Sequence, residues 1–201
     1  TEDDATSVTY GDTLQFSVSG NHGAGHWSVN DETLASIDNN GLLTALKGTG
    51  TVTVTYKSFG DATYNLAEVT KEITLNKKQL TVSAVINSKP YDGTTAGTGS
   101  IILEGIVGDD AVTATGTFEW VSADVDTTTF NVTGITLSAD DAENYVLNVT
   151  VLENLKNDGV KIEPKGLSGT LIAVITVVSV ILVLGIGLTS FMLIKRHKKK
   201  Q

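Results

Sequence analysis

The chain has 201 residues, no cysteine and a formal net charge of −9. Without cysteine it is not one of the disulfide-stapled small domains common outside animal cells, and its length allows one large domain or two small ones. Residues 1–166 hold all 23 acidic side chains but only nine of the 14 basic ones, a net charge of −14. Such a surface repels phosphate, so we expect no nucleic-acid partner.

Alternating apolar and polar residues predict β-strands along most of the chain. The pattern is clearest at residues 51–56 (TVTVTY), 72–76 (EITLN) and 79–86 (QLTVSAVI), and it is rich in β-branched side chains. Turn signals such as residues 38–41 (DNNG) interrupt it at short intervals. Before residue 167 no stretch has the period of an amphipathic helix. The pattern favours an all-β fold of small sandwiches.

A short internal echo predicts where one module ends and the next begins. Residues 73–80 (ITLNKKQL) align without a gap with residues 160–167 (VKIEPKGL), which places Leu75 opposite Ile162 at an offset of 87 residues. We interpret each copy as a last strand followed by a basic connection; the alternative is a coincidence of strand composition. The echo predicts two modules, residues 1–76 and 77–166.

Apolar strand positions and the two tryptophans predict one core per module. For the first module the expected core residues are Phe16, Trp27, Ile37, Leu43, Val52 and Val54. For the second they are Val82, Ile102, Phe118, Trp120, Val132, Ile135, Leu137 and Tyr145.

Residues 8–56 resemble a bacterial immunoglobulin-like domain of group 2. The opening strand YGDTLQFSVSG, the Trp-Ser pair at Trp27 and Ser28, the ASID strand, the Asn-Gly turn and the run GLLTALKGTGTVTV stand in the family's order. This copy departs from the family in the loop GNHGAGHW and in a further strand-like tail at residues 64–76. The resemblance implies a β-sandwich.

Residues 79–163 resemble the repeats of bacterial surface proteins and adhesins that are named for a Tyr-Asp-Gly motif. The matching pieces are KPYDGTTAG, LEGIVGDDAV and VTGITLSADDAENYVLN. Their motif residues, to which we assign a structural role, are Tyr91, Asp92, Gly93, Asp109, Asp110, Asn144 and Tyr145. The resemblance implies a β-rich building block without agreed catalytic residues; a second sandwich is expected, with a β-grasp-like fold as the alternative.

The C-terminal part predicts a membrane anchor. Residues 171–194 carry no charge and no proline, and as a helix they would extend roughly 36 Å, more than the ~30 Å of a bilayer's hydrocarbon core. We therefore expect a transmembrane helix within residues 167–194, the alternative being a buried helix of a soluble domain. The Leu-Pro-x-Thr-Gly signal for covalent attachment to the cell wall does not precede it, so a retained anchor is favoured.

The tail at residues 195–201 sets the expected topology. Its basic residues are Lys195, Arg196, Lys198, Lys199 and Lys200. The positive-inside rule places such a tail in the cytoplasm, next to anionic lipid, and residues 1–166 outside. Because the chain begins without Met or an apolar export signal, we expect a processed chain or the C-terminal piece of a longer one.

Few residues suggest chemistry. His22 and His26 are spaced for a shared metal but lie in a glycine loop without a third ligand. Acidic pairs such as Asp109 with Asp110 could offer oxygen atoms to calcium, but none has the D-x-D-x-D-G spacing of a calcium loop, and turn formation is the favoured explanation. We expect no enzyme, no metal and no cofactor.

These features together predict a non-enzymatic protein of the bacterial cell surface, in a Gram-positive organism because cysteine is absent. Two tandem modules on a single membrane span would act as a stalk that presents upstream domains for adhesion. In the alternative, the modules are themselves the adhesin and bind a carbohydrate or host protein; an accessory module of an extracellular enzyme is a more distant one. The sequence leaves the ligand and the oligomeric state open.

Overall fold

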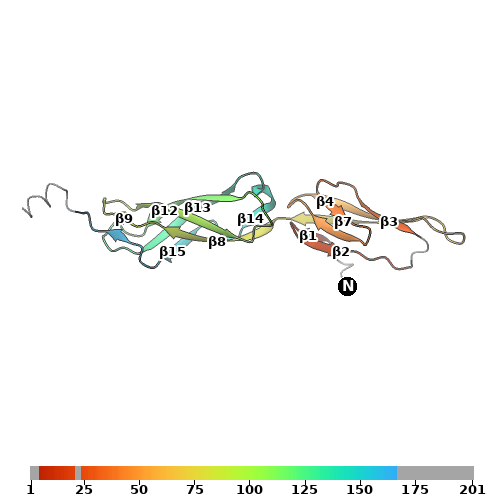
Figure 1. Ribbon diagram of the computed structural model, residues 1–201, viewed down its shortest axis with the longest axis horizontal. Helices are drawn as coiled ribbons and strands as arrows, with labels where there is room; N and C mark the ends of the chain where they lie inside the picture. Colours follow the sequence, from red (N-terminus) through yellow and green to blue (C-terminus); the bar gives the residue numbers. More distant parts are fainter. Residues whose placement is uncertain (1–4, 21–23, 167–201) are drawn as a thin grey trace, which may run out of the picture.

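The computed structural model describes residues 5–20 and 24–166 of the chain. This part is all-β and forms two domains that lie end to end along one long axis (Figure 1). His22, the predicted membrane-spanning segment at residues 171–194 and the basic tail from Lys195 to Lys200 lie outside the described residues. Within the described range, no helix has the length and apolar character needed to cross a bilayer.

The first domain is a sandwich of a four-stranded and a three-stranded sheet. The larger sheet has the order β1 (Ser7–Thr9), β7 (Ala67–Asn76), β6 (Thr51–Ser58) and β3 (Gly25–Val29). The smaller one has the order β2 (Thr13–Gln15), β5 (Leu42–Ala45) and β4 (Ala35–Ile37). Side chains of both sheets form one core, among them Leu43 of β5, Val52 of β6 and Ile73 of β7.

The second domain also places its core between sheets. One sheet has the order β10 (Ala96–Gly97), β12 (Thr113–Trp120), β13 (Thr129–Ser138) and β15 (Leu152–Lys156), and the other the order β11 (Gly99–Glu104), β8 (Lys78–Ile86) and β14 (Tyr145–Leu147). A short parallel pair, β9 (Lys89–Pro90) with β16 (Ile162–Glu163), lies at the end away from the first domain, and a 3-10 turn, η2 (Ala142–Asn144), precedes β14.

The predicted all-β class is confirmed for the described residues. A β-grasp requires a helix packed on its sheet, and the described part of the second domain contains only the 3-10 turn η2. Its strands show the alternation that a half-buried sheet requires: in β8 every second residue from Leu80 to Ile86 is buried. The second domain is therefore a sandwich as well.

Most predicted core residues are confirmed. Trp27 and Ile37 pack against the first core and Leu137 lies partly buried near the first domain, while the remaining predicted residues are buried, with one exception. The exception is Ile102, whose side chain is 44% exposed because β11 turns Ile101 and Leu103 inward instead. The prediction chose the wrong phase of a two-residue period, which reverses the face of every side chain in a strand.

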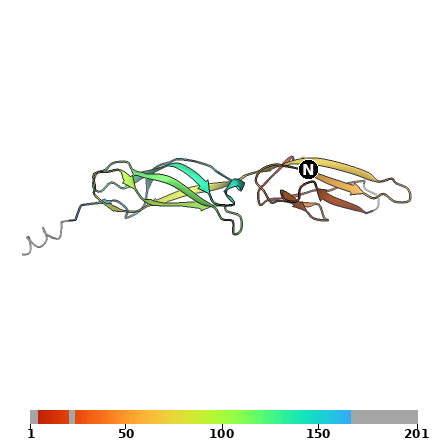
Figure 2. The same cartoon turned by 90° about the horizontal axis from the view of Figure 1, so that it is seen from above.

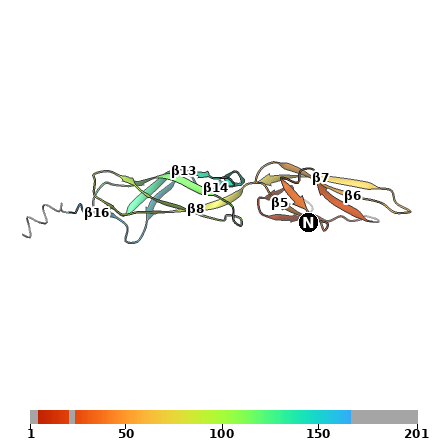
Figure 3. The same ribbon diagram turned by 45° about the horizontal axis from the view of Figure 1, so that its top comes forward.

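A single residue, Lys77, connects the domains. It lies between the end of β7 at Asn76 and the start of β8 at Lys78, and the two strands continue each other through the narrow waist of the molecule (Figures 2 and 3). The loops that surround this connection come from both domains, and their contacts form the candidate site below.

Candidate functional site: the joint between the domains

Two acidic turns close the end of the second domain that faces the first. The turn at residues 107–110 is closed by a hydrogen bond from Asp110 N–H to the Val107 carbonyl, at 3.2 Å. The second turn is tied to it, because the Ala111 N–H donates to the Asp141 carboxylate (2.9 Å) and the Asp141 N–H donates to the Ala111 carbonyl (3.3 Å). Asp110 and Asp141 thus belong to one rigid loop pair.

Tyr145 holds this loop pair from within the second domain. It is the first residue of β14 and only 2% of its side chain is exposed. Its hydroxyl donates to the Asp110 carboxylate and accepts a hydrogen bond of 2.9 Å from the Val107 N–H. One buried hydroxyl therefore orients the carboxylate of Asp110 toward the first domain.

The first domain contributes Tyr10, at the turn that follows β1. The Tyr10 hydroxyl donates to Oδ2 of Asp110 at 2.8 Å, the same oxygen that accepts from Tyr145. The two tyrosine rings meet edge to face, with centroids 5.4 Å apart and planes at 84°. Both rings are buried and belong to an apolar cluster that includes Leu80 and Val107. The Asp110 carboxylate thus accepts one hydrogen bond from a tyrosine of each domain. We call this arrangement of Tyr10, Asp110 and Tyr145 the tyrosine clamp.

The electrostatics of the clamp keep both tyrosines protonated. Burial, followed by the hydrogen bond to Asp110, raises the pKa of Tyr10 well above its usual value of 10. The same two causes, in the same order, raise the pKa of Tyr145 to about 12. Deprotonation would leave two negative groups in contact, so both hydroxyls remain donors at any physiological pH.

A second contact across the boundary joins Asn144 to Gly48. Asn144 is the last residue of η2 and is 2% exposed, and its side-chain oxygen accepts a hydrogen bond of 3.0 Å from the Gly48 N–H. A Cβ at Gly48 would lie only 2.6 Å from the Asn144 carbonyl oxygen and 2.8 Å from its Cα. The backbones can approach this closely only because residue 48 has no side chain.

Gly11 makes the other close approach. Its φ is +76°, in the left-handed region that favours glycine. A Cβ here would lie 2.7 Å from Cγ2 of Val107 in the second domain. The turn after β1 is therefore shaped to receive the loop that carries Asp110.

Two ion pairs lie at the rim. Lys47 Nζ is 3.1 Å from Oε1 of Glu143, and Lys78 Nζ is 3.1 Å from Oδ1 of Asp12. All four side chains are partly or largely exposed, so solvent and salt screen the pairs and each contributes little stability. We call the tyrosine clamp, the Asn144–Gly48 contact, the Gly11 turn and these two pairs together the joint.

Two family models match the chain. The model of the bacterial Ig-like domain (group 2) matches residues 1–65, and that of the YDG domain matches residues 76–152. The chain carries a bacterial Ig-like domain followed by a YDG domain. This is the order that the sequence predicts. No curated protein matches the chain. Strand β7 lies beyond the match to the Ig-like domain, yet it pairs with both β1 and β6 and completes the larger sheet.

The predicted motif residues of the YDG domain lie at its two ends. Asp110, Asn144 and Tyr145 gather at the joint, and Asp109 stands exposed on the same loop. The Tyr-Asp-Gly sequence itself lies at the opposite end, after β9 (Figure 1). The motif therefore does not form one site.

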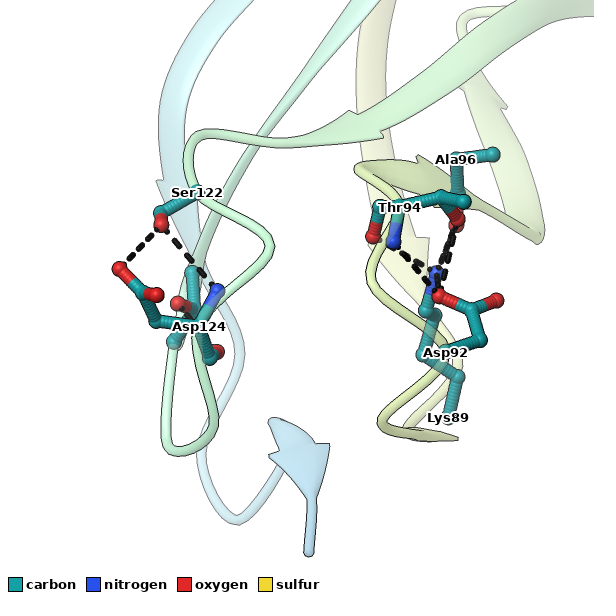
Figure 4. Close-up of polar contacts among 7 residues, drawn as sticks. Lys89, Asp92, Thr94, Ala96, Ser122 and Asp124 are labelled. Atoms are coloured by element: carbon teal, nitrogen blue, oxygen red, sulfur yellow. Dashed lines mark hydrogen bonds and ion pairs between the residues drawn. The ribbon is translucent and has the colours of Figure 1, made fainter. Parts of the chain in front are cut away.

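The Tyr-Asp-Gly turn is organised by a lysine (Figure 4). Lys89 Nζ is 2.8 Å from Oδ1 of Asp92 and donates to the carbonyl oxygens of Thr94 (2.9 Å) and Ala96 (2.8 Å). Asp92 also accepts from the Thr94 N–H at 2.9 Å. The hydrogen bond from Lys89, then those from Thr94, lower the pKa of Asp92 to about 2. Gly93 follows with a φ of +78°, a left-handed conformation that glycine adopts readily in a tight turn.

Sequence reasoning missed the partners that the Ig-like domain supplies: Tyr10, Gly11 and Gly48. Nothing local marks Tyr10 as more than a strand-end aromatic. The sequence does not mark Gly48 either, because only the structure shows that its φ lies outside the left-handed range and that the turn itself does not demand glycine. A glycine without such a demand indicates close approach by another backbone.

Of the residues considered as metal ligands, the structure describes His26, Asp109 and Asp110 but not His22. Among residues 5–20 and 24–166, no three side chains of His, Asp or Glu are placed to hold one ion. His26 is exposed on β3. The Asp110 carboxylate accepts a hydrogen bond from Tyr145, whereas its neighbour Asp109 is exposed. The acidic pairs serve turns instead: Asp124, for example, accepts from the Ser122 hydroxyl at 2.6 Å (Figure 4).

Proposed function

We propose that the chain is a non-enzymatic spacer of a bacterial surface protein, in which the Ig-like and YDG domains hold further domains away from the cell. The family matches support a surface-protein module. Ig-like and YDG domains are typically non-catalytic, and the buried polar groups of the joint are engaged in holding two domains together.

The end-to-end arrangement carries the proposal. The domains are linked by Lys77 alone, β7 and β8 continue each other, and the joint leaves no long flexible loop between them (Figures 1 and 3). A rigid pair transmits its full length, whereas a flexible chain of the same residue number collapses to a shorter mean span. This geometry suits a spacer better than a compact binding unit.

Membrane anchoring is the second part of the proposal. Its support is the sequence: 24 uncharged residues at 171–194 followed by five basic ones. The net charge of −14 over residues 1–166 would keep such a stalk soluble and away from an anionic envelope. Protease added to intact cells is expected to remove residues 1–166 and spare the tail; cleavage only after lysis would refute this orientation.

A domain-replacement experiment tests the spacer. A reporter binding domain is fused before Thr1 and displayed on cells, and its capture of a bulky partner is measured. Deletion of residues 5–166 should abolish capture, and an unrelated rigid pair of Ig-like domains of equal length should restore it. Full capture after deletion would refute the proposal.

The adhesin alternative makes a different prediction. If the Ig-like or YDG domain binds a carbohydrate or host protein, the chain should bind saturably on glycan and matrix arrays, and a rigid replacement pair should not restore that binding. The exposed residue His26, in a hollow with Trp27 and Glu32, is the place where we would look first. Robust binding there would replace the spacer by the adhesin.

A further inference from the structure

We infer that the end of the YDG domain is a docking surface for the end of an Ig-like domain, and that this surface, rather than the short connection at Lys77, sets the orientation of the two domains. The surface consists of Val107, Asp110, Asn144 and Tyr145. Its partner is the Ig-like face formed by Tyr10, Gly11 and Gly48. This goes beyond the spacer function and does not depend on it.

The polar groups of the two faces are complementary. The YDG face presents acceptors, the carboxylate of Asp110 and the side-chain oxygen of Asn144, and the Ig-like face presents donors, the Tyr10 hydroxyl and the Gly48 N–H. Asn144 is buried, so a partner without a donor at this point would leave its oxygen unpaired. Complementary buried groups of this kind select one partner and one orientation.

The YDG face is held ready by contacts within its own domain. Tyr145 and Val107 fix the Asp110 loop, and Asp141 ties that loop to η2, which carries Asn144. None of these contacts involves the Ig-like domain. A surface that is preorganised in this way binds with less loss of conformational entropy.

The shape of the faces specifies the kind of partner. Gly11 and Gly48 lie where a Cβ would be 2.7 Å from Val107 and 2.6 Å from Asn144, respectively. The matching partner is thus a domain end with a tyrosine before a left-handed glycine, and a second glycine in the neighbouring loop. Residues 10–12 (YGD) and 47–48 (KG) supply this pattern here.

Lengthening the connection shows whether the docking surface or the short connection at Lys77 sets the orientation of the domains. A flexible Gly-Ser segment of about eight residues is inserted after Lys77 in the full chain. Because the chain has no cysteine, Thr70→Cys in β7 and Ser83→Cys in β8, both exposed, accept one spin label each. The distance between the labels is then measured by pulsed electron spin resonance.

The docking surface predicts one narrow distance distribution before and after the insertion. Adding Gly48→Ala or Asp110→Ala to the lengthened chain should replace it by a broad distribution. The matched control is Thr49→Ala, a change at the exposed neighbour of Gly48, which should keep the narrow one. The nearest atoms to a Cβ at residue 48 all belong to Asn144 of the other domain, so Gly48→Ala should leave the Ig-like fold intact. Circular dichroism would verify this.

Two results would overturn the inference. If the inserted segment alone broadens the distribution, the connection sets the orientation and the surface does not. If the lengthened chain stays narrow with Gly48→Ala and with Asp110→Ala, the named contacts are not the recognition contacts. If the spin-label distances agree with the docking surface but the reporter experiment fails, the spacer proposal is refuted and the docking surface stands.

Discussion

The hydroxyl of Tyr10 donates a 2.8 Å hydrogen bond to the carboxylate of Asp110, 100 residues further along the chain and in the other domain. Tyr145 donates to the same carboxylate from within the YDG domain. A carboxylate that is partly withdrawn from water needs such donors, because its lost hydration must be replaced. The clamp therefore makes the Ig-like domain part of the environment in which the YDG domain is stable.

The first prediction concerns Tyr10→Phe, which keeps the ring and removes only the hydroxyl. Loss of one hydrogen bond to a partly buried carboxylate should lower the free energy of unfolding by about 1–2 kcal/mol. Thermal or denaturant unfolding of the full chain measures it. Tyr91→Phe is the control, since Tyr91 is 41% exposed at the far end of the YDG domain; equal effects of the two changes would refute a specific clamp.

The second prediction concerns Gly93 in the Tyr-Asp-Gly turn. Its φ is +78° and a Cβ would have ample space, its nearest neighbour being the Tyr91 hydroxyl at 4.0 Å. A valine should therefore cost about 1–3 kcal/mol through backbone strain rather than through a clash. Asn tolerates the left-handed region, so Gly93→Asn should cost clearly less. Equal melting temperatures for the valine variant and the parent chain would contradict the turn assignment.

The third prediction contrasts two apolar side chains of the YDG domain. Phe130 is fully buried, and Phe130→Ala should cost about 3–5 kcal/mol because it removes apolar burial and leaves a cavity. Ile102→Ala should cost well under that, about 1 kcal/mol or less, since 44% of Ile102 is exposed. Denaturant midpoints provide the comparison. A loss at Ile102 as large as that at Phe130 would restore the core assignment made from sequence.

Ile102 also shows why the sequence predicts strands better than their faces. The alternation in residues 99–104 is weak, with two adjacent isoleucines, so the period identifies a strand without saying which isoleucine points inward. Pairing with β8 decides it: Ile101 stands opposite Ala84 and Leu103 opposite Val82, both inward-facing residues of β8. The deciding information comes from a neighbouring strand and not from β11 itself.

The joint was beyond sequence reasoning for a related reason. The sequence identifies Asp110, Asn144 and Tyr145 as motif residues and correctly predicts that Tyr145 is buried. Their partners Tyr10 and Gly48 belong to a different family pattern, and no local periodicity connects residues about 100 positions apart. When each module is considered as a separate fold, Tyr145 is assigned to the YDG core. In the structure its ring packs against Tyr10 of the Ig-like domain.

The fourth prediction concerns acid. The pKa of Asp92 is lowered to about 2, first by the hydrogen bond from Lys89, so its contribution to stability is present above the unfolded value near 4 and is lost as the pH falls from about 4 to 2. Titration of the Asp92 carboxyl carbon by NMR should give this low value. Lys89→Met should return it toward the ordinary range; an unchanged pKa in that variant would show that Lys89 is not the cause.

The fifth prediction concerns alkali and tests the clamp itself. Because burial and Asp110 raise the pKa of Tyr145 to about 12 and that of Tyr10 still further above 10, their contribution is complete below pH 10 and is lost as the pH rises through the folded values. The spin-label distance in the lengthened chain should stay narrow up to about pH 10 and broaden as the pH approaches 12.

Tyrosinate absorbance supplies the matching optical measurement. Because burial and the hydrogen bond to Asp110 raise the pKa of Tyr10 and of Tyr145, a late fraction of the absorbance change should appear only well above pH 10. In Asp110→Ala the late fraction should shift to lower pH, because the hydrogen-bonded and charged neighbour that opposes ionisation is gone. A titration curve of Asp110→Ala that overlays that of the parent chain would mean that Asp110 does not hold these hydroxyls, and the clamp would have to be abandoned.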